Sequence, residues 1–471
     1  MWKLFLIGCV LTAITNFPAA FTHTSLNTAV HRVDEFFQKS YANRDIDIDQ
    51  QHLILLRSVL NCVWYGGQVA GALVSPLICD RYGRKVAFTV SITMMTFAGT
   101  LQTLASLTDY PEILIFGRIL SSCFSPLSDA ALILYLQEIS PSSFRGTMSS
   151  LYSTGYCVMG LAGMLIGNDH VLGHSLLILL AVPVIVGVPS ILFSIIMPET
   201  PKYLWLSRKN KNQAIRSLEF YQGQGADYLS DLDEMLREAS GQEKNTDKAT
   251  NLFKNTALKK AFGLSICTLC LTLPFYPLLQ SSTHFFTRLG VERSFAQLSS
   301  SGLMVALTIS CICSTLLIDR LPRRFLLLST GFTGIAALSL FVAFAYFEKA
   351  LEALAATFVF IFAYGFGIGP IGWMIPAELV PLSNRSVMFC SCYAVHSIFV
   401  VITSFITIPL FDIYGSLCFV PIFIIPSIIC LLYVMWHLPE TKGREINDIL
   451  LDLQGSKNAR THVADMKSEQ I

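Results

Sequence analysis

Long apolar stretches constrain this chain more than any other feature of its sequence. Twelve windows of about 20 residues are apolar enough to cross roughly 30 Å of hydrocarbon as helices. Charged residues make up only 14% of the 471 residues, against roughly a quarter in soluble domains. An all-α integral membrane protein is therefore predicted. The windows cover residues 4–22, 58–79, 86–108, 111–137, 147–167, 173–197, 261–282, 298–318, 325–347, 351–376, 386–410 and 416–438.

The first window has an alternative interpretation as a signal peptide. It begins with the basic residue Lys3 and ends near the small residues Ala19 and Ala20, as a cleaved leader would. Cleavage would leave eleven spans and remove the twofold pattern described below. We therefore expect this window to be the first transmembrane helix.

Positive charge is distributed unevenly among the predicted loops. If the termini and every second loop share one side of the membrane, that side holds about 25 of the 33 lysine and arginine residues, and Arg118 lies inside a span. Positively charged loops favour the cytoplasm. Both termini, CDRYGRK at 79–85 and the long segment 198–260 are therefore predicted to be cytoplasmic. The net charge of +1 does not indicate a nucleic-acid partner.

The thirteen cysteines all fall in apolar segments, which argues against a disulfide framework. Closely spaced pairs such as Cys267 and Cys270 have no flanking histidine or acidic ligands. We interpret them as packing residues, so no metal site is expected.

Three motifs recur at corresponding places in the two halves of the chain. The pairs are DRYGRK (80–85) with DRLPRR (319–324), YLQEISPSSFRG (135–146) with IPAELVPLSNRS (375–386), and MPETPKYL (197–204) with LPETKGRE (438–445). Paired motifs in matching positions indicate a duplicated six-helix unit. The predicted domains are an N-terminal six-helix bundle at 1–197, a cytoplasmic linker with short helices at 198–260, a C-terminal six-helix bundle at 261–438 and a cytoplasmic tail at 439–471.

The same motifs gather charge at one membrane face. Charge facing lipid is costly, so such clusters lie among headgroups or pair with one another. Four clusters on the same side favour pairing, and arginine suits it because its planar fork binds carboxylates in a bidentate manner. We predict a cytoplasmic gate network that holds helices together in one state and loosens in another. Its members are Arg81, Gly83 at the tight turn, Arg84, Glu138 and Arg145 in the first half, and Arg320, Arg324, Glu378 and Arg385 in the second.

Glycine and proline mark two spans that can bend. The seventh window contains LPFYPLL (273–279) and the tenth contains GFGIGPIGW (365–373). Unwound backbone is tolerated in membranes where it lines a cavity, and close packing against a neighbouring helix is the alternative.

These motifs resemble those of the sugar porter family of the major facilitator superfamily, specifically the facilitative GLUT-type hexose transporters. DRYGRK resembles the family's Asp-Arg-x-Gly-Arg-Arg turn, Gly117-Arg118 resembles its fourth-helix Gly-Arg, and PETKGRE (439–445) resembles its twelfth-helix signature. The likeness covers almost the whole chain. It implies twelve helices in two pseudo-symmetric bundles around a central cavity, and alternating access to that cavity.

The resemblance also implies where a sugar would be held, and there the sequence departs from the family pattern. Positions that carry glutamine, asparagine or glutamate in the family correspond here to Ser153, Cys270, Leu271, Tyr276, Met304, Gly365 and His396, whereas its tryptophan is kept as Trp373. The cavity candidates are Ser153, Tyr276, Trp373 and His396, with packing as the alternative for His396. A more apolar site suits a different polyol, a small organic anion or a less hydroxylated solute.

Asp129 is a separate candidate. It lies nine residues before Glu138, hence roughly 13 Å deeper along a helix. A carboxylate at that depth is costly unless paired, so it is a candidate for binding a proton or cation. A local hydrogen bond to Ser125 or Ser128, or an inter-helix contact, is the alternative.

The resemblance favours facilitated diffusion, because Thr22 stands where proton-coupled relatives carry aspartate. We expect a plasma-membrane uniporter for a small polar solute, with a sugar or polyol favoured. A facilitator of a non-hexose organic solute and a transporter-derived sensor or scaffold are the alternatives. The sequence shows no nucleotide-binding or catalytic motif, so neither an enzyme nor a cofactor is expected.

Overall fold

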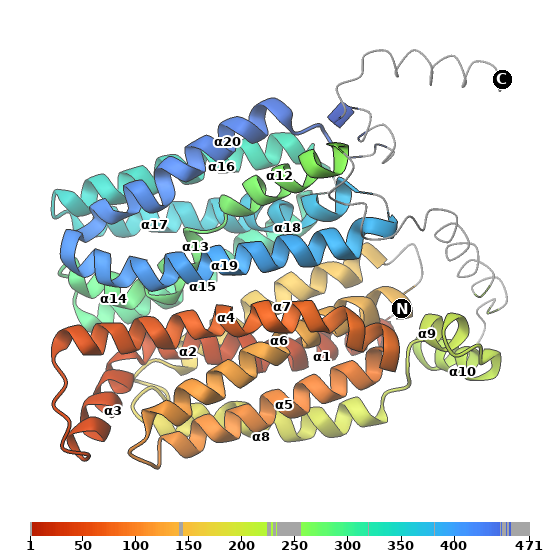
Figure 1. The fold of residues 1–471 in the computed structure, drawn as a ribbon, viewed down its shortest axis with the longest axis horizontal. Helices are drawn as coiled ribbons and strands as arrows, with labels where there is room; N and C mark the ends of the chain where they lie inside the picture. Colours follow the sequence, from red (N-terminus) through yellow and green to blue (C-terminus); the bar gives the residue numbers. More distant parts are fainter. Residues whose placement is uncertain are drawn as a thin grey trace.

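Long helices lie side by side along most of the molecule in the computed structural model (Figure 1). The described residues are 2–140, 145–223, 228, 232, 256–318, 320–380, 382–442, 444, 449, 452 and 453. Ten stretches of these residues are helical, long and apolar enough to cross a membrane. Helices α5 (Arg84–Ala105) and α7 (Arg145–Ile166) lie in the same bundle, which makes twelve long segments within the described chain.

The first half of the bundle, residues 2–196, contains six of these segments. The first span is built from three consecutive helices and is followed by a short amphipathic helix, α3. The remaining elements are single helices. Their bounds are α1 (Trp2–Asn16), η1 (Phe17–Phe21), α2 (Thr22–Thr28), α3 (Val30–Ala42), α4 (Gln50–Tyr82), α5, α6 (Pro111–Ile139), α7 and α8 (Leu176–Ile196).

The second half, residues 256–437, repeats this arrangement after α9 (Pro201–Leu206) and α10 (Lys211–Gln222). Helices α9 and α10 lie in the linker predicted at 198–260 to contain short helices, and most of that linker after residue 223 lies outside the described residues. The elements are α12 (Thr256–Cys270), α13 (Phe275–Gln280), α14 (Ser282–Arg288), α15 (Arg293–Leu317), α16 (Arg323–Tyr346), α17 (Ala350–Ala363), η4 (Tyr364–Ile368), α18 (Gly369–Glu378), α19 (Leu382–Tyr414), η5 (Gly415–Cys418), η6 (Val420–Ile424) and α20 (Ile425–His437).

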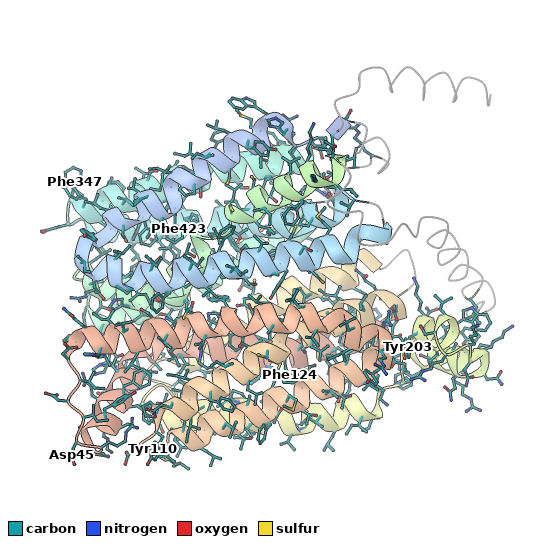
Figure 2. All side chains as sticks on the ribbon, in the orientation of Figure 1. Asp45, Tyr110, Phe124, Tyr203, Phe347 and Phe423 are labelled. Atoms are coloured by element: carbon teal, nitrogen blue, oxygen red, sulfur yellow. The ribbon has the colours of Figure 1, made fainter. Side chains whose placement is uncertain are left out.

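The bundle has two ends, which we name after the helices found there. Helix α3 and the labelled residues Asp45, Tyr110 and Phe347 lie at one end, the α3 end (Figure 2). Helices α9 and α10, with Tyr203, lie at the opposite end, the α9 end, together with the start of α1.

Four of the described spans are interrupted, two of them where glycine and proline predicted a bend. The seventh loses its helical pattern between Cys270 and Pro274. The tenth passes through the π-helical turn η4, which covers the start of GFGIG. The first and twelfth spans also contain π-helical turns, η1 around Pro18 and η6 around Pro421. The missing N–H of a proline removes one helical hydrogen bond.

The outside of the bundle is apolar. Leu77, Ile185 and Leu316 are 71%, 69% and 69% exposed, and they belong to three different spans. Apolar side chains on this scale are unfavourable in water and stable against lipid. The exposed surface therefore agrees with the predicted membrane protein.

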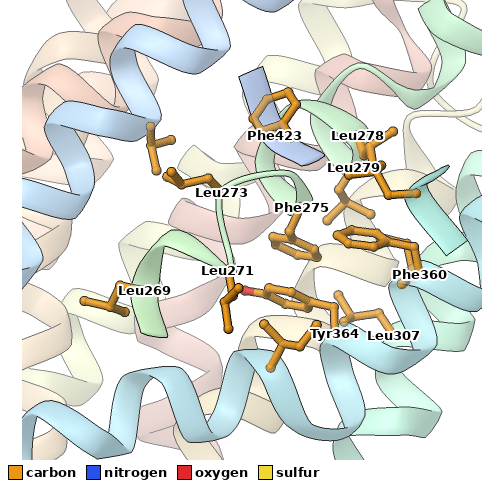
Figure 3. Close-up of a cluster of buried hydrophobic side chains, with 14 of the residues drawn as sticks. Leu269, Leu271, Leu273, Phe275, Leu278, Leu279, Leu307, Phe360, Tyr364 and Phe423 are labelled. Atoms are coloured by element: carbon orange, nitrogen blue, oxygen red, sulfur yellow. The ribbon is translucent and has the colours of Figure 1, made fainter. Parts of the chain in front are cut away.

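Apolar packing also fills the second half where the seventh span breaks. The Phe275 and Tyr364 rings stack with centroids 3.8 Å apart and planes 2° apart, and Phe360 lies beside them (Figure 3). Leu271 points into the same cluster. This packing holds the broken seventh span against the π-helical turn of the tenth.

Candidate functional site

A buried charge cluster joins four segments of the chain at the α9 end. The Arg84 Nε atom on α5 lies 2.9 Å from Glu138 Oε1 at the end of α6. The Thr200 hydroxyl donates a 2.5 Å hydrogen bond to the other carboxylate oxygen of Glu138. Arg84 also donates to the carbonyl oxygen of Cys79 at 3.2 Å. The cluster thus connects α4, α5 and α6 with the segment after α8.

Glu199 secures the tight turn that precedes α5. The backbone N–H of Lys85 donates to both carboxylate oxygens, at 3.0 and 3.1 Å. Gly83 has φ of +101°, and a Cβ atom there would lie 2.3 Å from Glu199 Oε2 and 2.8 Å from Tyr203 Cε1. Burial raises the pKa of Glu199 above its usual value, and the backbone N–H groups act in the opposite direction. Glycine is required at this position both by backbone conformation and by space.

The second half repeats the cluster with Arg323 in place of Arg84. Arg323 Nε lies 3.7 Å from Glu378 Oε1, and the Thr441 hydroxyl donates to Glu378 Oε2 at 2.5 Å. The backbone N–H groups of Arg323 and Arg324 donate to Glu440 at 2.8 and 3.0 Å. Arg324 is the predicted network member in this segment, and its side chain donates to the carbonyl oxygen of Met435. Arg323 holds the place of Arg84 in the repeated motif, which explains the difference.

The other predicted gate residues contribute differently. The Arg81 guanidinium lies 5.5 Å from the Tyr82 ring, and the Arg81 carbonyl oxygen accepts from Tyr203. The Arg320 carbonyl oxygen accepts from Lys442 at 2.7 Å. The side chains of Arg145 on α7 and Arg385 on α19 lie outside the described part of the structure. The role of all these residues as a gate stays a prediction.

Aromatic and polar side chains from both halves meet in the interior. The His396 ring on α19 lies 5.0 Å from that of Trp373 and 5.4 Å from that of Tyr276. His396 Nε2 is 2.9 Å from the Thr272 hydroxyl oxygen. The Tyr276 ring in turn lies 5.3 Å from the ring of Tyr65 on α4. Three of the four cavity candidates from the sequence are therefore neighbours, and Tyr65 extends the group into the first half.

The remaining two predicted interior residues lie on adjacent helices of the first half. The Asp129 carboxyl group accepts hydrogen bonds from Tyr152 on α7 and from Ser125. The Ser125 bond is the local alternative that the sequence raised, and Tyr152 adds an inter-helix contact. Ser153 also lies on α7, but its side chain lies outside the description.

Five buried polar or aromatic residues near this group were not selected from the sequence as site candidates. Tyr65 lies 3.3 Å from His23 Nε2 and 3.4 Å from Gln280 Oε1, measured from its hydroxyl oxygen. Trp64 packs beside His23, and Arg118 lies over the Trp64 ring with a separation of 5.5 Å. The signal for His23 was the polar run THTSLNT (22–28), which extends the first span beyond its apolar window. Arg118 could have been selected from the sequence because it is a charged residue within a predicted transmembrane span.

At the α3 end, a chain of charged groups passes between the halves. Arg57 on α4 binds Asp34 on α3, with Nη2 and Oδ2 2.5 Å apart. Arg57 Nη1 lies 2.8 Å from Nδ1 of His284 on α14. His284 Nε2 is 3.3 Å from Asp412 Oδ2, and Arg288 Nε is 2.6 Å from the other oxygen of Asp412. Arg57 and His284 are thus a direct link between the first and second halves.

Burial changes the titration of this chain of groups. It lowers the pKa of His284, and the positive charge of Arg57 lowers it further, although Asp412 acts in the opposite direction. Burial also raises the pKa of Asp34, which the guanidinium of Arg57 partly offsets. A neutral His284 can accept from Arg57 through Nδ1, so protonation would remove this bond.

Two further contacts join the two halves at the α3 end. Asn27 on α2 donates to the Ser282 hydroxyl on α14 at 2.8 Å. Arg293 at the start of α15 pairs with Asp169, which follows α7, at 2.7 Å. The structure therefore holds the two halves together at the α3 end.

Comparison with known proteins identifies the family. The model of the family described as "Sugar (and other) transporter" matches residues 2–452. The chain belongs to this family. It is therefore a membrane transporter and not an enzyme.

Curated relatives of this sugar transporter family are similar over nearly their full length. Facilitated glucose transporter member 3 of solute carrier family 2 from Mus musculus is 26% identical over 459 residues, which cover 92% of this chain and 90% of the relative. Member 1 from Gallus gallus is 27% identical over 441 residues, covering 88% and 86%.

Solved structures of the xylose transporter XylE have the same fold. The proton:xylose symporter XylE bound to 6-bromo-6-deoxy-D-glucose aligns with a TM-score of 0.74 at 15% identity, covering 95% of this chain and 98% of XylE. The inward open conformation of XylE from E. coli aligns with a TM-score of 0.75 at 14% identity, covering 95% and 99%. The predicted major facilitator fold is therefore confirmed.

Packing explains why this family member differs at some expected sugar contacts. A Cβ atom on Gly365 would lie 2.0 Å from Ser310 Oγ and 3.1 Å from the Leu307 carbonyl oxygen, so the expected glutamate cannot be accommodated here. Met304 and Leu271 are buried in the apolar cluster of the second half. The aromatic and polar group around His396 is instead the best-defined candidate for contacting solute.

Proposed function

We propose that the protein moves a small polar solute down its gradient by alternating access, with a sugar or polyol favoured. The group formed by Tyr65, Tyr276, Trp373 and His396 carries this proposal, because it joins both halves in the interior. In a polyol site, aromatic faces contact the C–H groups and a few polar atoms form hydrogen bonds with the O–H groups. Thr22 in place of a carboxylate supports facilitated diffusion.

The two halves are the moving parts in this proposal. They correspond to the predicted bundles 1–197 and 261–438, with 198–260 as a linker and 439–471 as a tail. The α9-end clusters join helices within each half, so each half moves as a unit. The links at the α3 end must break when the solute site opens on that side.

We place the α9 end in the cytoplasm. The turns at Arg84 and Arg323 and the helices α9 and α10 lie there, and these segments carry the excess of positive charge that favours the cytoplasmic face. The N-terminus lies at this end, and the tail is proposed to share it. Uptake of an external solute suits residence in the plasma membrane.

Uptake into liposomes tests the function. Purified protein is expected to equilibrate labelled glucose, xylose or glucitol in a saturable manner without accumulation under a pH gradient. Tyr276→Ala and His396→Ala should lower uptake at least tenfold, because each removes an aromatic face and a polar atom. Trp436→Ala, on the exposed surface, is the matched control. Folded protein that neither transports nor is thermally stabilised by any polar solute would contradict the proposal.

A proton gradient separates this proposal from symport. Asp129 is the interior carboxylate that could couple to protons. Accumulation of solute above its external concentration under a pH gradient, abolished in Asp129→Asn, would replace facilitated diffusion with symport.

A further inference from the structure

Two cysteine thiols meet in the interior, at the boundary between the two halves. Cys157 on α7 belongs to the first half and Cys311 on α15 to the second. The Cys157 thiol donates to the sulfur of Cys311, with the two Sγ atoms 3.5 Å apart, and both residues are buried. A disulfide bond is about 2.0 Å long, so an approach of about 1.5 Å would join the two halves covalently.

The helices that carry these cysteines pack closely against each other. A Cβ atom on Gly160, one turn after Cys157 on α7, would lie 2.3 Å from Met304 Cε on α15. Met304 precedes Cys311 by about two turns, so the two helices run antiparallel and touch at both levels. The thiol contact therefore belongs to an interface between the two halves.

Cys430 provides a comparison within one half. Its thiol forms hydrogen bonds with Cys267 and Cys270 on α12, and Cys430 itself lies on α20. A disulfide at this place would join two helices of the second half. A disulfide between Cys157 and Cys311 would instead join the two moving parts.

We propose that Cys157 and Cys311 are a modification site, at which peroxide forms a reversible disulfide that stops transport. This inference rests on the proposed function, because it concerns the movement of one half against the other. A covalent bond between α7 and α15 fixes their relative position, and alternating access requires that position to change. Dithiols reverse the modification by thiol–disulfide exchange.

The reaction balances with hydrogen peroxide as the oxidant. When the halves separate, water reaches the interior and one thiol loses its proton to become the nucleophilic thiolate. Its sulfur attacks a peroxide oxygen and the O–O bond breaks, which gives a sulfenic acid and a hydroxide that takes up the released proton. When the halves close, the second thiol attacks the sulfenic sulfur. The S–S bond forms, the S–O bond breaks, and the hydroxyl group leaves with the thiol proton as a second water.

Peptide mapping of the wild-type protein tests the cross-link and needs no variant. Proteoliposomes are treated with hydrogen peroxide, the remaining thiols are blocked, and proteolytic fragments are compared by mass spectrometry with and without dithiothreitol. We expect two fragments joined through residues 157 and 311, which separate on reduction. Recovery of both cysteines as thiols after peroxide treatment, or linked only to other cysteines, would overturn the proposal.

Uptake by the same samples tests the consequence of the cross-link. Peroxide should lower uptake by the wild type in proportion to the fraction of cross-linked molecules, and dithiothreitol should restore it. Cys157→Ala and Cys311→Ala should each remove this sensitivity, because a disulfide needs both sulfur atoms. Cys430→Ala removes a thiol contact within one half, so this matched control should stay as sensitive as the wild type.

The outcomes separate this inference from the proposed function. If the cross-link between residues 157 and 311 forms and uptake is undiminished, the redox inference is overturned and the transporter proposal stands. Sensitivity that persists in Cys157→Ala, or that disappears in Cys430→Ala, also overturns the inference. If the reduced wild-type protein is folded and moves no solute, the proposed function fails, and the claim that the cross-link controls transport fails with it.

Discussion

The two ends of the bundle use charge in different ways. At the α9 end, Arg84 with Glu138 and Arg323 with Glu378 join helices of the same half. At the α3 end, the described structure has polar contacts between the halves, of which Arg57 to His284 is one. The difference teaches that similar ionic clusters can stabilise a rigid unit or hold a movable interface, depending on which helices they connect.

The largest effect should come from removing the buried partner of Arg84. Glu138→Gln leaves this guanidinium without its carboxylate, which costs about 3–5 kcal/mol in a buried pair. Glu378→Gln should cost about 1 kcal/mol, because its arginine is further away at 3.7 Å and the Glu378 side chain is more exposed. Thermal unfolding in detergent, with uptake measured in parallel, compares the two.

A charge swap tests the pairing at Glu138 more strictly. Glu138→Arg alone should abolish uptake, and adding Arg84→Glu should restore part of it. An equal loss in the single and double variants would remove the basis for treating the α9-end cluster as a pair.

The next effect concerns the turns at the two ends. Gly83→Ala forces positive φ on a residue whose Cβ would contact Glu199, so we expect a loss of about 3 kcal/mol. Gly290→Ala is the matched control, since its φ is +86° but no atom lies within 4 Å of the added Cβ. It should cost about 1 kcal/mol. Similar unfolding temperatures for both variants would show that space around Gly83 is unimportant.

Cutting a link between the halves should change opening more than folding. Arg57→Gln removes the ion pair with Asp34 and weakens the contact to His284. Amide hydrogen exchange in α14 should accelerate about tenfold. This corresponds to a loss of about 1.4 kcal/mol in the free energy that keeps the two halves in contact at the α3 end. Arg44→Gln breaks an ion pair at the same end but within the first half, so it should leave exchange in α14 unchanged. Equal exchange in both variants would contradict the inter-half role of Arg57.

The smallest effect is a pH dependence of the contact between the two halves at the α3 end. Because the pKa of His284 is lowered in the closed form, opening takes up a proton, and closure should weaken as pH falls below about 6.5. Asp34 acts in the opposite direction, since its pKa is raised in the closed form. The difference between wild type and His284→Gln isolates the histidine. The protection factors of the α14 amides, which correct for the intrinsic exchange rate at each pH, should fall at most a few-fold from pH 7.5 to 5.5, and only in the wild type.

The sequence predicted most of the architecture because hydropathy and duplication act locally. Apolar windows located the spans, and the repeated motifs located the charge clusters. The first span was predicted to end at residue 22 but continues to Thr28, because the polar run there is buried against other helices rather than lipid. In the second cluster the sequence indicated Arg324, whereas the arginine beside Glu378 is its neighbour Arg323.

Contacts between the halves could not be predicted in this way. Asn27 and Ser282 lie 255 residues apart, and nothing local in either segment identifies the other as its partner. The same holds for Gln280 beside Tyr65, which depends on where the seventh span breaks. Arg118 was visible as a charge within a span, but only the structure shows that the described residues offer it no carboxylate.

A reversible lock across the α3 end tests the central claim most directly. Asn27→Cys with Ser282→Cys replaces a 2.8 Å contact between the halves, and Asn43→Cys with Asp109→Cys replaces a 2.9 Å contact within the first half. With Cys157→Ala as the common background, oxidation should abolish uptake in the first pair, with recovery after reduction, and leave it intact in the second and in the background variant. Undiminished uptake by protein shown to be cross-linked between residues 27 and 282 would contradict the account.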